Sequence, residues 1–313
     1  MKNRITMFAL PLLTIILFCF SFSINTGQAE ESGKKLRPQE IGENIFGSMM
    51  LSEAVYLMVG DRGKIYCSTD SGAHWLEVAS GTRELLFSVS FPDTQNGWIS
   101  GGSGVILHSR DGGKIWSMQA SGTEKHLFSI HFSDPLHGCA VGDWGVVVIT
   151  EDGGTTWQDV SLPEDIVLYA VRFLDMEHGW IVGEYGKIFR TEDGGKTWTP
   201  IPGVVDKSLF CLSVDEGSLC AAGLDGVIVY SRDQGRSWMK AESVSGEAIY
   251  GIAVRGEGGW AVGDRGTVLR SRDGGKSWQV VEVPAKSKLF WIATVSLASG
   301  SGPVAYAAGA YGL

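Results

Sequence analysis

Six aspartates at nearly equal spacing are the first residues in this chain that could do chemistry. Each lies in the pattern S/T-x-D-x-G-x-x-W, and they recur every 40 or 41 residues: Asp70, Asp111, Asp152, Asp193, Asp233 and Asp273. A calcium loop would use such residues, but calcium needs several oxygen ligands and only one carboxylate is constant here. A short Asp side chain can instead accept hydrogen bonds from its own loop. We therefore expect structural aspartates, with no catalytic residue, metal or cofactor.

A pair of glycines, G-x-x-G, begins ten residues before each of these aspartates. The pairs are Gly60/Gly63, Gly101/Gly104, Gly142/Gly145, Gly183/Gly186, Gly223/Gly226 and Gly263/Gly266, with a seventh at Gly309/Gly312. Glycine-rich loops that bind phosphate open a helix, whereas these lie between two predicted strands. Glycine readily adopts the positive φ of tight hairpins. We interpret the pairs as turns.

Histidines and cysteines offer weaker signals for chemistry. His137 and His178 precede the glycine of a hairpin turn, where the second repeat has Asn96. Asn and His tolerate left-handed backbone, so a turn role is favoured over a metal role. Cys211 and Cys220 lie on successive predicted strands and could form a disulfide if directly opposite, with packed free thiols as the alternative.

The elements that position these residues repeat with the same period. In the second repeat, strands are predicted at 86–91, 97–100, 105–109 and 116–121, separated by turns. One bulky or soft residue of each second strand recurs as a packing ring: Leu57, Trp98, Cys139, Trp180, Cys220, Trp260 and Tyr306. Four strands in about 41 residues are typical of a β-propeller blade. The chain is predicted to be all-β.

The two ends of the chain carry further expectations. Residues 1–29 contain a basic start, an apolar run and small residues before Glu30, which predicts a cleaved secretory signal peptide over a retained membrane anchor. Residues 30–44 are a polar linker or closing strand, and 45–313 form the propeller. Without the leader, 24 basic and 35 acidic residues give a net charge of −11, which disfavours nucleic acid as a partner.

Seven blades are predicted, because residues 289–297 and 304–313 match a first and second strand but no seventh aspartate loop follows. Three ways of closing the ring stay open. Residues 34–48 could supply a strand to the last blade, a partner could do so, or the chain could be truncated.

The aspartate loops resemble the Asp-box, or bacterial neuraminidase repeat. The longer pattern GWAVGDRGTVLRSRDGGKSW, at residues 259–278, is similar to the photosystem II stability/assembly factor family, and the resemblance covers about residues 45–313. It implies a seven-bladed propeller in the periplasm or a thylakoid-lumen-like compartment. Such a propeller binds protein partners of a membrane complex, without catalysis and without itself spanning the membrane.

A carbohydrate-active Asp-box protein, either a sialidase or another glycoside hydrolase, is the alternative. In sialidases an Arg-Ile-Pro signature opens the domain, and this chain has none. Xyloglucan-type Asp-box hydrolases resemble paired propellers, whereas 313 residues suffice for one. Shared fold does not exclude grafted chemistry.

The two residues inside each G-x-x-G pair are predicted to ring one mouth of the channel, opposite the Asp-boxes. Bulky residues among them, namely Arg62, Trp144, Tyr185, Arg265 and Tyr311, are the candidate partner-binding residues. Arg, Trp and Tyr anchor interfaces, and a turn does not need them for its own conformation. The alternative is that exposed turns simply tolerate them.

Overall fold

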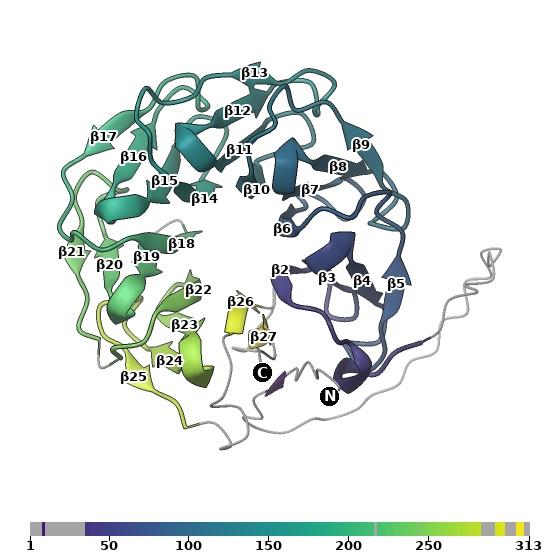
Figure 1. Cartoon of the computed structure of the whole chain (residues 1–313). Coiled ribbons are helices and arrows are strands. Elements are labelled where there is room, and N and C mark those ends of the chain that lie inside the picture. Colours follow the sequence, from purple (N-terminus) through teal and green to yellow (C-terminus); the bar gives the residue numbers. More distant parts are fainter. Residues whose placement is uncertain are drawn as a thin grey trace.

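The repeats fold into blades arranged around a central channel in the computed structural model (Figure 1). The structure describes residues 8–9, 35–215, 218–243, 245–282, 292–297 and 305–309. Six antiparallel four-stranded sheets follow the chain in order, each with its first strand innermost. The chain is therefore an all-β propeller.

The first three blades have these strands: β2 (Ile45–Met50), β3 (Tyr56–Gly60), β4 (Ile65–Ser68) and β5 (Leu76–Val78); β6 (Leu86–Ser90), β7 (Gly97–Gly101), β8 (Ile106–Ser109) and β9 (Ser117–Gln119); β10 (Leu127–Phe132), β11 (Gly138–Gly142), β12 (Val147–Thr150) and β13 (Gln158–Asp159). The next three have these: β14 (Leu168–Phe173), β15 (Gly179–Gly183), β16 (Ile188–Thr191) and β17 (Thr199–Ile201); β18 (Leu209–Asp215), β19 (Ser218–Gly223), β20 (Ile228–Ser231) and β21 (Met239–Lys240); β22 (Ile249–Arg255), β23 (Gly258–Gly263), β24 (Val268–Ser271) and β25 (Gln279–Val280).

The prediction of seven blades is wrong, because the described residues form six four-stranded blades. Between the sixth and first blades lies a three-stranded sheet, made by β26 (Ile292–Leu297), β27 (Ala305–Gly309) and β1 (Phe8–Ala9) (Figure 1). The β26–β27 hairpin matches only the two inner strands of a blade. No Asp-box loop follows it in the sequence, and β1 pairs with β27 from the other end of the chain.

Residues 35–44 do not supply a strand to the last blade. Leu36 pairs instead with Trp75 in the first blade, with both backbone hydrogen bonds at 2.8 Å. Ile41, after the short 3-10 helix η1 (Pro38–Glu40), is fully buried against that blade with Ile45 and Tyr56. The closing-strand hypothesis is therefore wrong for this segment, and β2 is the inner strand of the first blade rather than the last.

Neighbouring blades pack closely together at an Asp-box glycine. The described members of the predicted packing ring, Leu57 to Trp260, are all at most 5% exposed. In the first joint, a Cβ at Gly113 would lie 2.6 Å from Leu57 Cδ1 of the preceding blade. A Cβ at Gly235 or Gly275 would overlap Trp180 or Cys220 in the same way. Glycine is required there because the neighbouring side chain occupies the space of a Cβ.

The Asp-box tryptophans pack toward the preceding blade. Trp116 joins Leu57 and Val59 of the first blade in one cluster, and Trp278 joins Cys220 of the fifth blade in another. These tryptophans therefore pack at the joint between their own blade and the blade before it.

Candidate functional site

Six short turns, one per blade, form one end of the propeller. They are the 3-10 turns η2 (Asp61–Gly63), η3 (Gly102–Gly104), η4 (Asp143–Gly145), η5 (Glu184–Gly186), η6 (Leu224–Gly226) and η7 (Asp264–Gly266), and we call the surface that they form the turn face. Each turn is tied to the start of its own inner strand, as where Asp61 N–H donates to Asn44 O at 2.9 Å. The Asp-box loops instead bond to the turn between the first and second strands, as where Gly112 N–H donates to Gln95 O at 2.9 Å. They therefore lie at the end of the propeller opposite the turn face.

The first glycine of each pair is extended rather than left-handed. Gly60 has φ −169°, and a Cβ there would overlap the backbone oxygen of Asn44. Positive φ falls on the second glycine, as at Gly63 with φ 70°, and also on the residue before it. The glycine prediction is thus right for the second member of each pair and wrong for the first, which is needed for close approach.

Bulky residues occupy left-handed backbone on the turn face. The values of φ are 56° at Arg62, 53° at Ser103, 58° at Trp144, 56° at Tyr185, 57° at Asp225 and 49° at Arg265. This conformation costs roughly 1–2 kcal/mol for a residue with a Cβ, and Gly, Asn or Asp adopt it most readily. Four of the six blades nevertheless carry Arg, Trp or Tyr at this position. These residue types are not the ones that the left-handed backbone conformation favours.

The candidate side chains project into solvent. Trp144 is 63% exposed and Tyr185 67% exposed, on neighbouring blades. Arg62 is exposed, and Arg265 Nη1 lies 3.2 Å from Glu247 Oε1. The first and sixth blades, which carry Arg62 and Arg265, lie on either side of the three-stranded sheet (Figure 1). Tyr311, the fifth candidate, lies outside the described residues.

Acidic groups surround Trp144 and Tyr185. Asp143 and Glu184 each directly precede one of them in the sequence. Burial raises the pKa of Asp143, and the nearby Glu184 carboxylate raises it further against the opposing effect of His126. Glu184 Oε2 accepts the Val167 N–H at 2.9 Å, which fixes its carboxylate beside the inner strand. This part of the turn face is therefore aromatic and acidic.

A ring of aromatic side chains lines the channel beneath the turn face. We call it the aromatic collar, and its half-buried members, one per blade, are Phe46, Phe87, Phe128, Tyr169, Phe210 and Tyr250. Successive centroids lie 5.7, 5.1, 6.0, 5.1 and 5.7 Å apart, within the range of favourable ring contacts. Burial raises the pKa of Tyr169, and so do the nearby Glu184 and Asp143 carboxylates, which shows that collar and turn face adjoin.

The aromatic collar was not predicted from the sequence. Each aromatic follows the first, buried Leu or Ile of the inner strand, where the register with the second strand shifts by one residue. Such a bulge turns an otherwise core-facing side chain toward the channel. The repeated aromatic at this position was a visible signal, but a strand with unknown register does not tell the direction in which it points.

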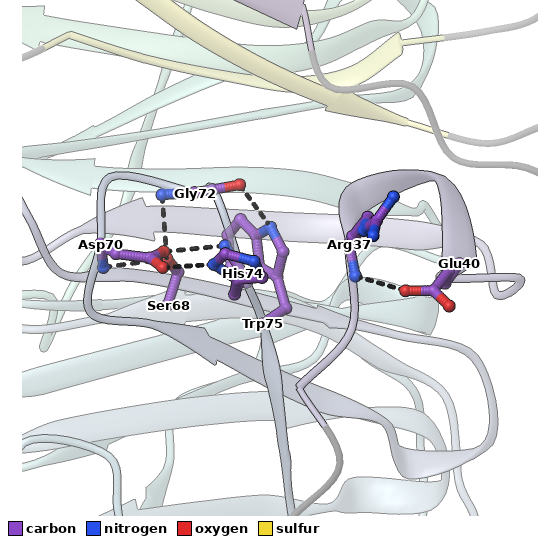
Figure 2. A network of polar contacts seen from close by, with 7 residues as sticks. All are labelled: Arg37, Glu40, Ser68, Asp70, Gly72, His74 and Trp75. Atoms are coloured by element: carbon purple, nitrogen blue, oxygen red, sulfur yellow. Dashed lines mark hydrogen bonds and ion pairs between the residues drawn. The ribbon is translucent and has the colours of Figure 1, made fainter.

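The Asp-box carboxylates hold their own loops. In the first loop Ser68 Oγ donates to Asp70 Oδ1 at 2.9 Å, His74 N–H donates to it at 2.8 Å, and Trp75 Nε1 donates to Gly72 O at 3.1 Å (Figure 2). In the fifth loop, hydrogen bonds from the Ser237 hydroxyl and backbone lower the pKa of Asp233 to about 2. No cluster of three metal-ligating side chains occurs in the described part of the chain.

The histidine turns and the cysteines differ in part from expectation. His137 and His178 are absent from the residues with positive φ. They are held instead by an aspartate three residues earlier, with His137 Nδ1 2.8 Å from Asp134 Oδ2. The left-handed explanation is therefore wrong, although both residues do lie in turns. Cys211 pairs with Ala222 and Cys220 with Ser213, so the thiols are not opposite and both are free.

The fold and its loops define an Asp-box β-propeller. The chain belongs to the family of the photosynthesis system II assembly factor YCF48. The sequence model of this family matches residues 43–121, 115–202 and 156–245. No curated protein sequence matches the chain at a significant level. Among the described residues, no helix is long and apolar enough to cross a membrane.

Solved structures with the same fold include YCF48 proteins, GH74 glycoside hydrolases and WD40 propellers. "YCF48 bound to D1 peptide" is 17% identical, with a TM-score of 0.68, over 91% of this chain and 97% of that one. YCF48 from Cyanidioschyzon merolae is 19% identical, with a TM-score of 0.67, over 86% and 94%. The GH74 xyloglucanase from Xanthomonas campestris is 14% identical, with a TM-score of 0.71, over 86% of this chain and 51% of the enzyme. At these identities the likeness shows the fold alone.

Proposed function

We propose that the protein is an exported, non-catalytic propeller that binds a protein partner at its turn face and helps to assemble or stabilise a membrane protein complex. The observation that carries the proposal is the set of bulky residues in left-handed turns. Trp144 and Tyr185 are both more than 60% exposed and keep a costly backbone conformation. A surface without a partner gains nothing from such residues.

The chemistry of the turn face favours a peptide segment as the partner's contact. Exposed Trp, Tyr and Arg side chains are typical anchors of protein interfaces. The aromatic collar beneath them adds apolar surface that a partner's side chain could reach. A related propeller has been solved with a D1 peptide bound. We infer that a segment of a membrane protein binds here in the same general manner.

Export and lack of catalysis belong to the same proposal. We propose that residues 1–29, which also supply β1 in the structure of the whole chain, direct transport to the periplasm or to a thylakoid-lumen-like compartment. The GH74 likeness keeps a glycoside hydrolase as the competing function. A screen of the purified protein against xyloglucan and sialosides separates the two, because only an enzyme releases reducing sugar or free sialic acid.

Charge reversal at the turn face tests the binding proposal. Arg62→Glu with Arg265→Glu should abolish capture of the partner from detergent-solubilised membranes of the source cells. Stability should stay within about 0.5 kcal/mol, as is usual for exposed sites. The matched control is Arg236→Glu with Arg272→Glu, which makes the same charge change at exposed positions in two Asp-box loops. Equal capture by both folded double variants would refute binding at the turn face.

A further inference from the structure

The channel inside the aromatic collar contains a cavity of about 140 Å³. Inner strands of all six blades line it, and its walls are mainly aromatic rings, small residues and serine hydroxyls. Arg172 of β14 is the one charged side chain among the described residues that line this cavity. The cavity therefore combines aromatic rings and serine hydroxyls in its lining with a single positive charge.

Hydrogen bonds place the Arg172 guanidinium on the channel side of its strand. The Val171 N–H does not bond within its own sheet but donates to Ser129 Oγ of the preceding blade at 3.2 Å. In an antiparallel strand the N–H and C=O of one residue point the same way, so Val171 O faces the channel edge as well. Arg172 Nη1 donates to this oxygen at 2.7 Å and to Ser129 Oγ at 3.2 Å.

Nothing in the described part of the chain compensates this charge. Burial lowers the pKa of Arg172, and the other group acting on it is the Cys211 thiol rather than a carboxylate. Burial raises the pKa of Cys211 to about 12, so the thiol is neutral at pH 7. Burial and the Arg172 charge lower the pKa of His131 to about 3, so that ring is neutral too. A cation withdrawn from bulk water without a counter-ion is unfavourable, and an anion beside it removes that cost.

We propose that the channel binds a small organic carboxylate, with its carboxyl group on the guanidinium of Arg172 and its apolar body among the rings of the aromatic collar. The planar guanidinium matches a carboxylate in geometry, and one charge matches a monoanion. The volume suits a molecule about the size of benzoate. Two sources have this chemistry: a free metabolite, or a carboxylate on a protein partner. The proposal stands apart from partner binding at the turn face.

Calorimetric titration with sodium benzoate at constant ionic strength tests the site. The full-length protein should bind benzoate saturably with one site, and neutral benzamide should not bind. Arg172→Met should weaken binding at least tenfold, and Arg172→Lys should weaken it less. The control Arg272→Met, an exposed arginine in an Asp-box loop, should leave it unchanged. No saturable binding, equal binding of benzamide, or undiminished binding by folded Arg172→Met would overturn the proposal.

A second measurement needs no variant and decides the matter if Arg172→Met does not fold. Phenylglyoxal modifies accessible arginines, and mass spectrometry of the digested protein reports each site separately. Benzoate should slow modification of Arg172 and leave Arg272 unaffected, whereas equal rates with and without benzoate would overturn the proposal. If benzoate binds and also displaces a captured partner, the natural carboxylate belongs to that partner. If it binds without displacing the partner, the natural ligand is a free small molecule.

Discussion

Removing the Trp278 side chain should destabilise the propeller strongly. Trp278 is 2% exposed and packs against Cys220 and Ala222 of the preceding blade. Truncation of a buried Trp to Ala costs about 3–5 kcal/mol through the cavity that remains. Its Nε1 also donates to Gly275 O at 3.0 Å, and leaving this buried carbonyl without its donor adds about 1 kcal/mol. We therefore expect Trp278→Ala to cost about 4–6 kcal/mol.

Trp198 provides the matched comparison. It occupies the same Asp-box position two blades earlier, but it is half-buried and its buried Nε1 has no hydrogen-bond partner within the described structure. Trp198→Ala should therefore cost about 3 kcal/mol, the lower end of the range.

Guanidinium denaturation followed by far-ultraviolet circular dichroism measures both variants, with the slope of the transition checked for two-state behaviour. A cost below about 1 kcal/mol for Trp278→Ala, or a larger cost for Trp198→Ala, would refute the packing argument.

Three further predictions concern the loops and thiols. Gly235→Ala should lower the free energy of unfolding by at least about 2 kcal/mol more than Gly81→Ala in the same denaturation assay. Both glycines have positive φ, but only a Cβ at Gly235 would meet another side chain, that of Trp180. Asp233 has a folded pKa of about 2, below the ordinary unfolded value of about 3.9, so its contribution to stability is complete above pH 4 and is lost as the pH falls toward 2. The denaturant concentration at the midpoint of unfolding should decrease as the pH is lowered from about 4 to 2. Asp233→Asn should reduce this pH dependence, whereas an unchanged dependence would contradict the hydrogen-bond network. Burial raises the pKa of Cys139, Cys211 and Cys220, which makes these thiols less reactive. A thiol reagent should therefore modify half-buried Cys67 before these three in the native protein. Rapid labelling of the three buried thiols would show that the joints between blades open.

Local repeat chemistry could be predicted from the sequence because it depends on neighbours in the chain. The Ser-x-Asp spacing places a hydroxyl and a carboxylate within one loop, and the structure has Ser271 Oγ donating to Asp273 at 2.8 Å. Alternating apolar residues identified the strands of the second blade to within two residues at most ends. The turn residues Trp144 and Tyr185 were found because G-x-x-G marks the same turn in every blade.

Features that depend on register or on distant segments could not be predicted. The aromatic collar depends on a bulge in each inner strand. The position of the Arg172 guanidinium depends on its hydrogen bond to Ser129 of the neighbouring blade. The predicted blade count was wrong because the β26–β27 hairpin has the sequence pattern of two inner strands, and within the described residues its sheet gains only β1 from the other end of the chain. Pairing of Leu36 with Trp75 joins segments almost forty residues apart, and no local pattern indicates it.

Site-specific photo-crosslinking tests partner binding at the turn face most directly. A benzophenone amino acid replaces Trp144, which is 63% exposed on the turn face, or Met118, which is 59% exposed on the outer strand β9. After irradiation with solubilised membranes of the source cells, mass spectrometry identifies the crosslinked peptides. Position 144 should crosslink to one segment of a membrane protein, and position 118 should not. Crosslinks from position 118 alone, or the same products from both positions, would contradict the account.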